Sequence, residues 1–279
     1  MSYFSTEADH PVALLSTEDL IIELFVRVDQ QMQRIPKDTR CKLWPGEIVT
    51  LGLLFSIKGV GERAFDRWLR RDWLKLFPHL PERTRLFRLL STHSNWTQQF
   101  LADPTFFGVI DGFGIELIHP CREGRCVNPI GKKGLSNHRW IYGGKLGVVL
   151  NGQGLICAWD ATTANTYDGH AFKHLIEQFR DSMIVLGDGN FHCSEDHGGD
   201  APNLKVCKRK TWSERIVIET MLSMLTVVCH FKKVAHRRWR YFVARLAYMM
   251  AAFNVMVQLN GLNLGEDGQY HPSIARFAL

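Results

Sequence analysis

The chain has 279 residues, of which 46% are hydrophobic and 22% charged, with a formal net charge of +6. This composition excludes a disordered chain and is ample for a packed core, in one large domain or two modest ones. The first eleven residues lack the basic and apolar regions of a secretory signal. The longest apolar stretch, 246–259, is shorter than the roughly 18 to 20 residues of a membrane span, so we expect a soluble protein.

The cysteines indicate the cell compartment, and the distribution of charge indicates the kind of ligand. Seven cysteines are spread along the chain, an odd number that favours a reduced, cytosolic compartment over a disulfide scaffold. Residues 201–245 contain eleven Lys or Arg and only two Glu, so the basic excess is concentrated there. Such a region suits a polyanion such as DNA, although a solvated helical face has the same composition.

Residues 1–104 are predicted to be helical. Ser16 and Asp19 form an N-cap pattern for an amphipathic helix over 17–34, and Pro45 begins a second helix that ends near residue 57. A glycine-containing turn leads to a basic third helix over 62–76, and two short helices follow Pro81 and Ser94. The second and third helices form either a helix-turn-helix that binds DNA or an ordinary helical hairpin.

From residue 105 the pattern changes to strands. Strands are predicted over 105–118, 141–150, 155–160, 183–188 and 204–207, with a hairpin turn at Asn151 and Gly152. Three helices are predicted in the same region. The first covers 168–180, the second begins after a capping box of Thr211 and Glu214, and the third covers about 238–259. This order resembles the ribonuclease H-like arrangement, in which an antiparallel three-strand meander continues into parallel strands. We therefore expect an α/β fold with two domains, a helical region over 1–104 and a ribonuclease H-like catalytic domain over 105–279.

Three acidic residues lie in apolar segments of this second region. Asp111 and Asp188 belong to strand-like segments, and Glu219 lies in a helical one. A carboxylate is costly to bury alone, but three that converge would bind a divalent cation such as Mg²⁺ and support two-metal phosphodiester chemistry. Each Asp precedes Gly, so a turn-forming role is the alternative.

The ordered motifs of residues 47–257 resemble those of the DDE transposases of bacterial insertion sequences, above all the nine-eighty-two group, with the insertion sequence four and five types as relatives. The matching motifs, in order, are Phe77-Pro78-His79-Leu80 with Arg83, Val109-Ile110-Asp111, Gly131-Lys132-Lys133-Gly134, Tyr142-Gly143-Gly144-Lys145-Leu146, Asn165 with Asp168, Leu186-Gly187-Asp188, Arg215 with Ile218-Glu219, His236-Arg237-Arg238, and Phe242.

The resemblance implies an enzyme that cleaves and joins DNA at the inverted-repeat ends of its own insertion sequence. Asp111 would bridge two Mg²⁺ ions, for which Mn²⁺ can substitute, while Asp188 and Glu219 would each hold one. Double-stranded DNA, both element ends and target, would be the partner of a homodimer in the bacterial cytoplasm, associated with the nucleoid. No membrane partner is expected.

The chain departs from the family's pattern at two positions, with a mild exchange of tyrosine for Trp212 and a larger change at Thr226. Relatives often have a lysine seven residues after the glutamate that contacts the element end, where this chain has Thr226, so Lys232 or Lys233 would compensate. Lys132, Lys133 and Arg139 are predicted in a long loop between the first two strands, where they would track DNA. The full set of expected DNA-binding residues is Lys132, Lys133, Arg139, Arg215, Lys232, Lys233, His236, Arg237 and Arg238.

Three alternatives remain open at this point. The chain could be a transposase-derived DNA-binding protein that has lost its chemistry, or a ribonuclease H-fold nuclease acting on RNA hybrids or junctions. A structural zinc site could also form from the Cys and His residues, although their spacing differs from the common CxxC pattern. The residues considered for zinc are Cys121, Cys126, His192, Cys193, His197 and Cys207.

Overall fold

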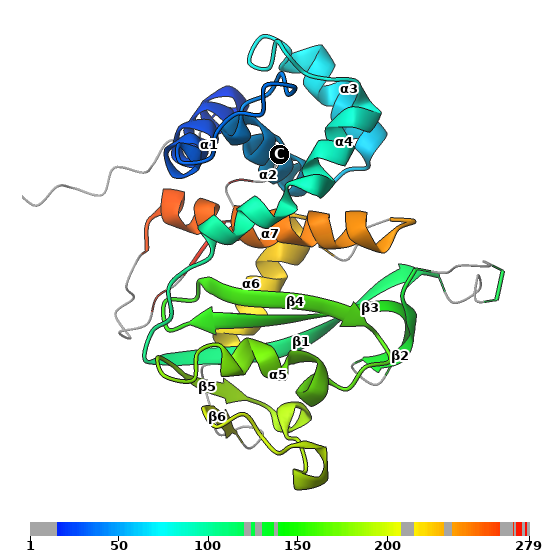
Figure 1. The fold of residues 1–279 in the computed structure, drawn as a ribbon, viewed down its shortest axis with the longest axis vertical. Helices are drawn as coiled ribbons and strands as arrows, with labels where there is room; N and C mark the ends of the chain where they lie inside the picture. Colours follow the sequence, from blue (N-terminus) through cyan, green and yellow to red (C-terminus); the bar gives the residue numbers. More distant parts are fainter. Residues whose placement is uncertain are drawn as a thin grey trace, which may run out of the picture.

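The computed structural model describes residues 16–119, 124–125, 130–136, 139–207, 215–231, 236–262, 270, 272–274 and 277. Helices form the N-terminal part, as predicted (Figure 1). They are α1 (Thr17–Met32), α2 (Pro45–Lys58), α3 (Glu62–Asp72), α4 (Arg83–Thr92) and the 3₁₀ helix η1 (Ser94–Phe100). The predicted capping box of Thr211 and Glu214 lies outside the described residues.

Local sequence signals account for the ends of the first helices. The Ser16 hydroxyl accepts a hydrogen bond from the Asp19 amide at 3.1 Å, which confirms the predicted cap of α1. Gly59, with φ of +63°, ends α2. α3 ends at Asp72, four residues before the predicted end, because Trp73 leaves the helix and packs edge-on against Trp68, with ring centroids 6.0 Å apart.

A mixed six-stranded sheet follows, in the order β2-β3-β1-β5-β6, with β4 paired to β3. β1 pairs antiparallel with β3 and parallel with β5, and β5 pairs parallel with β6. The predicted meander that continues into parallel strands is therefore confirmed, and the curled mixed sheet is consistent with a ribonuclease H-like fold. The strands are β1 (Phe107–Ile118), β2 (Lys132–Ser136), β3 (Arg139–Asn151), β4 (Ile156–Thr163), β5 (Ile184–Gly187) and β6 (Leu204–Val206).

The prediction of a loop at Lys132 and Lys133 is wrong, because both residues lie in β2. This strand pairs antiparallel with the beginning of β3, from Lys132 opposite Gly143 to Ser136 opposite Arg139. Its one large apolar side chain, Leu135, is 50% exposed. Backbone hydrogen bonds to β3, not burial, therefore hold β2 in the sheet, and they leave no hydrophobic pattern in the sequence.

Alternate residues of β1 serve different faces of the sheet. Ile110 packs with Phe172 of α5 (Asp168–Glu177), in a small cluster on one face. Val109 and Phe113 belong to the larger cluster on the other face, with buried residues of α6 (Arg215–Val228) and α7 (Trp239–Asn260). In Figure 1, α5 lies in front of the sheet and α6 behind it.

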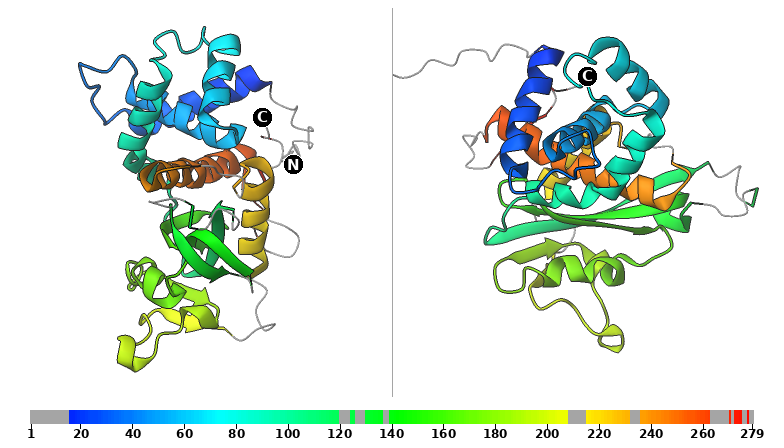
Figure 2. Two further views of the ribbon diagram at one scale, coloured as in Figure 1. Left: turned by 90° about the vertical axis from the view of Figure 1, so that its right-hand side faces the viewer. Right: turned by 45° about the horizontal axis from the view of Figure 1, so that its top comes forward.

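Helix α7 lies between the N-terminal helices and the sheet, as Figure 1 and the left view of Figure 2 show. It is long and apolar enough to cross a membrane, but 83% of its most apolar window is buried inside the molecule, as in a core helix of a soluble protein. The larger core cluster contains side chains from α1, α2 and α4 as well as from β1 and α7. One continuous core thus joins the helical and mixed α/β regions, and their division into two domains stays a prediction.

A buried amide on α7 joins these regions by hydrogen bonds. Asn254 is fully buried, and its side-chain oxygen accepts from the Ile156 amide at 2.8 Å. Its side-chain nitrogen donates to the carbonyl oxygens of Phe100, at 2.9 Å, and Ile156, at 2.8 Å. The Asn254 amide therefore provides hydrogen-bond partners for backbone groups of β4 and of the end of η1 together.

Candidate active site on the central sheet

The register between β1 and β5 places two of the predicted acids side by side. Phe107 pairs with Ile184 and Val109 with Leu186, partners that are 77 residues apart. Asp111 and Asp188 are also 77 residues apart, two positions further along the same register. Neighbouring strands lie about 4.8 Å apart, so the two carboxylates start from adjacent backbone positions.

Both acids also belong to the same face of the sheet. Asp111 has the parity of Val109 and Phe113, which face α6 and α7. Asp188 continues β5 in an extended conformation, with φ of −82° and ψ of 177°. Paired residues of parallel strands point to the same side, so Asp188 shares the face of Asp111. Both residues are partly exposed, as a site open to substrate requires.

Local hydrogen bonds orient the two carboxylates. Asp111 Oδ1 accepts from the Gly112 amide at 2.7 Å. The two Asp188 oxygens accept from the backbone and side-chain nitrogens of Asn190, at 2.9 and 3.1 Å. Asp188 thus also begins a 3₁₀ turn, Gly189–Phe191, so the turn-forming alternative is correct for its local role. A carboxylate oxygen has two lone pairs, so one that accepts a single hydrogen bond can still bind a cation.

Glu219 lies on α6, the helix that covers this face. Ile218, Met221 and Leu225 are fully buried and anchor α6 beside β1, whereas Glu219 is exposed. Within the described part of the chain, no three His, Cys, Asp or Glu side chains form a group that could hold one metal ion. The structure therefore places Asp111 and Asp188 together, and brings Glu219 to the same side without gathering all three.

The comparison with known proteins identifies this region. Residues 106–255, more than half of the chain, match a family model described as "Transposase DDE domain". The chain belongs to this transposase family. No curated protein matches the chain significantly. The match begins just before β1 and ends within α7, so the segment that carries the three acids is the matched transposase domain.

A nearly buried ion pair supports the transposase domain behind Asp111. Lys145 of β3 donates to Asp168 Oδ1 at 2.7 Å and to the Thr166 carbonyl oxygen at 2.9 Å. A Cβ at Gly112 would lie 3.0 Å from Asp168 Oδ2, so Asp168 packs directly against the residue after Asp111. Burial raises the pKa of Asp168, Lys145 opposes that rise, and the charge of Asp188 adds to it. The sequence motifs contain both residues but do not reveal that they pair.

A double-mutant cycle on this pair is expected to show strong coupling. Asp168→Asn leaves the Lys145 ammonium without its carboxylate, and Lys145→Met leaves Asp168 without its cation. Urea unfolding of both single variants and the double variant should give a coupling free energy of about 1–3 kcal/mol. The surface pair Arg71–Asp72 serves as the control, with coupling below about 1 kcal/mol. Additive effects at Lys145 and Asp168 would contradict the structural role of the pair.

The predicted DNA-binding residues form two groups. In the first, Lys132 and Lys133 are exposed on β2 and Arg139 is exposed at the start of β3. Arg139 pairs with Glu116, and Lys133 lies 5.9 Å from the centre of the Trp140 ring, which is 61% exposed. Basic groups beside an exposed aromatic ring can contact both phosphates and bases.

The second group precedes α7. Arg237 and Arg238 are exposed, whereas His236 is partly buried, and its contact with DNA stays a prediction. Lys232 and Lys233 lie outside the described residues, as does the side chain of Arg215, although its backbone begins α6. Thr226 is half-buried on α6.

Burial of His236 should make the stability of the transposase depend on pH. Burial, and secondarily the charge of Arg245, lowers the pKa of His236 from 6.5 to about 4. The neutral ring therefore contributes stability that is present above pH 6.5 and is lost as the pH falls through 4. Relative to His236→Gln, the wild type should lose roughly 2–3 kcal/mol of unfolding free energy over that range. Urea unfolding at several pH values measures this, and parallel curves would contradict it.

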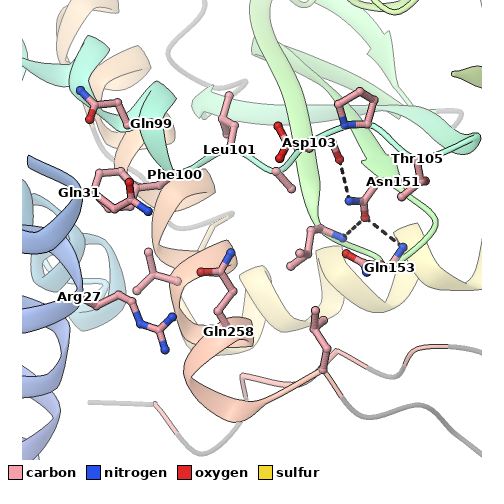
Figure 3. Close-up of a pocket in the computed structure, with 15 residues that line it drawn as sticks. Arg27, Gln31, Gln99, Phe100, Leu101, Asp103, Thr105, Asn151, Gln153 and Gln258 are labelled. Atoms are coloured by element: carbon pink, nitrogen blue, oxygen red, sulfur yellow. Dashed lines mark hydrogen bonds between the residues drawn. The ribbon is translucent and has the colours of Figure 1, made fainter. Parts of the chain in front are cut away.

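Figure 3 shows a polar cavity. It has a volume of about 510 Å³, and its lining includes Gln31 of α1, Gln99 of η1 and Gln258 of α7. Asn151 closes one side, where it donates to the Asp103 carbonyl oxygen and accepts from the amides of Gln153 and Leu155, each at 3.0 Å. Neither Asp111 nor Asp188 lines this cavity, so it is separate from the candidate active site.

The zinc alternative receives no support from the described residues. His192 pairs with Asp200, at 3.0 Å between Nδ1 and Oδ2, and Cys193 is buried. These residues form no metal-binding group with other described side chains. Cys121 and Cys126 lie outside the described residues.

Proposed function

We propose that this protein is a DNA transposase that cleaves and joins DNA at the inverted-repeat ends of its own insertion sequence. The observation that carries the proposal is the placement of Asp111 and Asp188 at adjacent register positions, on one face of the sheet, within the matched transposase domain. Their donor set fits a hard divalent cation, since Mg²⁺ is commonly bound through one or two carboxylates and completes its shell with water and substrate phosphate.

In this proposal Asp111, Asp188 and Glu219 are the catalytic residues and the metal ligands. The three carboxylates of Asp111, Asp188 and Glu219 would hold two Mg²⁺ ions, for which Mn²⁺ can substitute. When bound, the ions would activate water or a 3′-hydroxyl and stabilise the leaving oxygen. Glu219 lies on α6, which packs beside β1, so a movement of α6 would be needed to bring its carboxylate to the aspartates.

The finer assignments belong to the same proposal. The ribonuclease H-like fold, the nine-eighty-two group and the cytoplasmic, nucleoid-associated location follow from the resemblance of the motifs. Residues 1–104 would act as a DNA-binding region, in which α2 and α3 correspond to the helix-turn-helix. Joining two element ends at once favours a homodimer on DNA.

The direct test is a cleavage and joining assay on inverted-repeat ends with purified protein and Mg²⁺ or Mn²⁺. Metal-dependent nicks at the repeat boundary, followed by joining to target DNA, support the proposal. Binding to the ends without cleavage would favour the non-catalytic DNA-binding alternative. Cleavage of RNA hybrids or junctions without joining would favour the nuclease alternative.

The DNA-binding residues can be tested by the salt dependence of binding. Each phosphate contact contributes about 0.9 to the slope of log K against log salt. Lys132→Gln, in the exposed β2 strand, should lower the magnitude of that slope by about 1, and a similar reduction is expected for Arg237→Gln and Arg238→Gln. Arg180→Gln, an exposed position after α5 and outside residues 1–104, provides the matched control. An unchanged slope would remove the residue concerned from the DNA interface.

A further inference from the structure

A strongly basic hollow lies where the N-terminal helices meet the start of α7. Its volume is about 700 Å³, and it extends from the first turn of α3 to the residues before α7. One acidic residue, Glu62, lines it, together with five arginines, which are Arg63, Arg67, Arg237, Arg238 and Arg245. Such an excess of fixed positive charge on concave walls favours an anionic ligand.

Arg245 is the buried arginine of this hollow. It lies on α7 and is 4% exposed, with its guanidinium carbon 4.6 Å from the centre of the Phe55 ring. Nη1 donates to the Val60 carbonyl oxygen at 3.2 Å. Nε and Nη2 have no hydrogen-bond partner among the residues that the structure describes. Unsatisfied buried donors on a charged group are costly, so a ligand whose oxygen atoms reach and accept from both would be favoured.

The charge of Arg245 persists at neutral pH. Burial lowers its pKa from 12.5 to about 10, while Cys229 and Glu62 oppose that shift. Glu62 does not neutralise it by direct contact, because it makes no hydrogen bond to the two unsatisfied nitrogens. The planar guanidinium presents Nε and Nη2 side by side, the arrangement that binds two oxygens of a phosphate or carboxylate.

Two further features favour an anion over a neutral ligand. α3 has eleven residues and begins at the hollow. Its N-cap residue is Gly61, so no N-cap side chain accepts a hydrogen bond from the first amides of the helix. Its free N–H groups and helix dipole attract negative charge. His236 also lines the hollow, and its buried Nε2 has no hydrogen-bond partner within the described part of the chain, so the neutral ring can donate to an anion.

We propose that this hollow is a phosphate-binding site in which Arg245 binds the phosphate group and Arg63 and Arg67 neutralise it. The ligand is a phosphodiester of the DNA backbone, because the exposed arginines spread over a hollow larger than one phosphate. The assignment of the ligand to DNA rests on the proposed function, whereas the binding of a phosphate group in the hollow does not. Because its walls come from α3 and from α7, a bound backbone would hold the N-terminal helices and the transposase domain on one DNA segment.

The phosphate site is tested on the full chain by thermal unfolding in inorganic phosphate against sodium chloride of equal ionic strength. Wild type should gain about 5 °C in Tm in saturating phosphate. Arg245→Met should fold, since it replaces an unsatisfied charge by an apolar chain of similar length, and should lose the gain. Arg88→Gln, an exposed change on α4 outside the hollow, should keep it. An equal gain in Arg245→Met, or none in wild type, overturns the site.

A second variant keeps the test decisive if Arg245→Met does not fold. Arg63 and Arg67 are both exposed, so changing both to Gln leaves the core intact. This double variant should need about 10-fold more phosphate for half of the Tm gain, and an unchanged requirement overturns the site. Asp111→Asn should keep the full gain, so a failure of the proposed catalytic function is distinguishable from a failure of this site.

Fluorescence anisotropy with duplexes that carry a 5′-phosphate or a 5′-hydroxyl then separates the sources of the phosphate group. A backbone ligand predicts that Arg245→Met weakens binding of both duplexes by about the same factor, near 10-fold. A weakening confined to the 5′-phosphorylated duplex would overturn the backbone assignment in favour of a terminal phosphate. Unchanged affinity for both, with the Tm gain lost, would support the phosphate site and overturn its assignment to DNA.

Discussion

Asp111→Asn is expected to abolish metal-dependent strand cleavage while leaving DNA binding within about twofold of wild type. The amide keeps the size and the hydrogen bond to the Gly112 amide but removes the negative charge that would hold the metal. Loss of about 4 kcal/mol of transition-state stabilisation corresponds to a rate at least about 10³-fold lower. Single-turnover cleavage of labelled element ends, with anisotropy for binding, measures both quantities.

The same loss is expected for Asp188→Asn and Glu219→Gln. Asp181→Asn is the matched control, because Asp181 is an exposed aspartate between α5 and β5. This variant should cleave DNA at the wild-type rate. Wild-type cleavage by Asp188→Asn would refute the pairing of the two aspartates as the active site. Wild-type cleavage by Glu219→Gln alone would leave that pair intact and remove α6 from the chemistry.

Asn254→Leu is expected to lower the free energy of unfolding by roughly 3–6 kcal/mol, the largest stability effect predicted for this chain. Leucine fills a similar volume but leaves the Ile156 amide and the carbonyl oxygen of Phe100 without the Asn254 amide, inside a fully buried site. Urea-induced unfolding followed by circular dichroism measures the change.

Gln258→Leu provides the control for that substitution. It makes the same kind of change one turn later on α7, at an exposed position, and should alter stability by less than about 0.5 kcal/mol. If Asn254→Leu were as stable as Gln258→Leu, the hydrogen bonds between α7, β4 and η1 would contribute nothing to the joint core.

Features encoded over a few neighbouring residues could be predicted from the sequence. The cap at Ser16, the buried pattern of α1 and the change to strands after residue 104 depend on local contacts, and the structure has them within a few residues. The pairing of Asp111 with Asp188 follows from strand order, because the resemblance to a known arrangement of strands supplies information that local patterns lack.

Features that depend on distant contacts could not be predicted. β2 forms by backbone pairing to β3, which requires no apolar side chains, so its sequence is typical of a basic loop. Lys145 and Asp168 are 23 residues apart and meet only after β3 and α5 have packed. Arg245 is the last of the eleven basic residues in 201–245, a composition that favours a surface, yet its side chain lies in the core because α7 passes under the N-terminal helices.

The position of α7 has a consequence for synthesis on the ribosome. The apolar surfaces of α2, η1 and β4 are made early, but the helix that covers them, Trp239–Asn260, emerges from the exit tunnel more than 75 residues after the end of β4. Until then a nascent chain exposes the edge of β4 and the faces of α2, which are the surfaces that aggregate. Chains released before α7 should be found in the insoluble fraction, and folding of the N-terminal helices should be completed only near the end of translation.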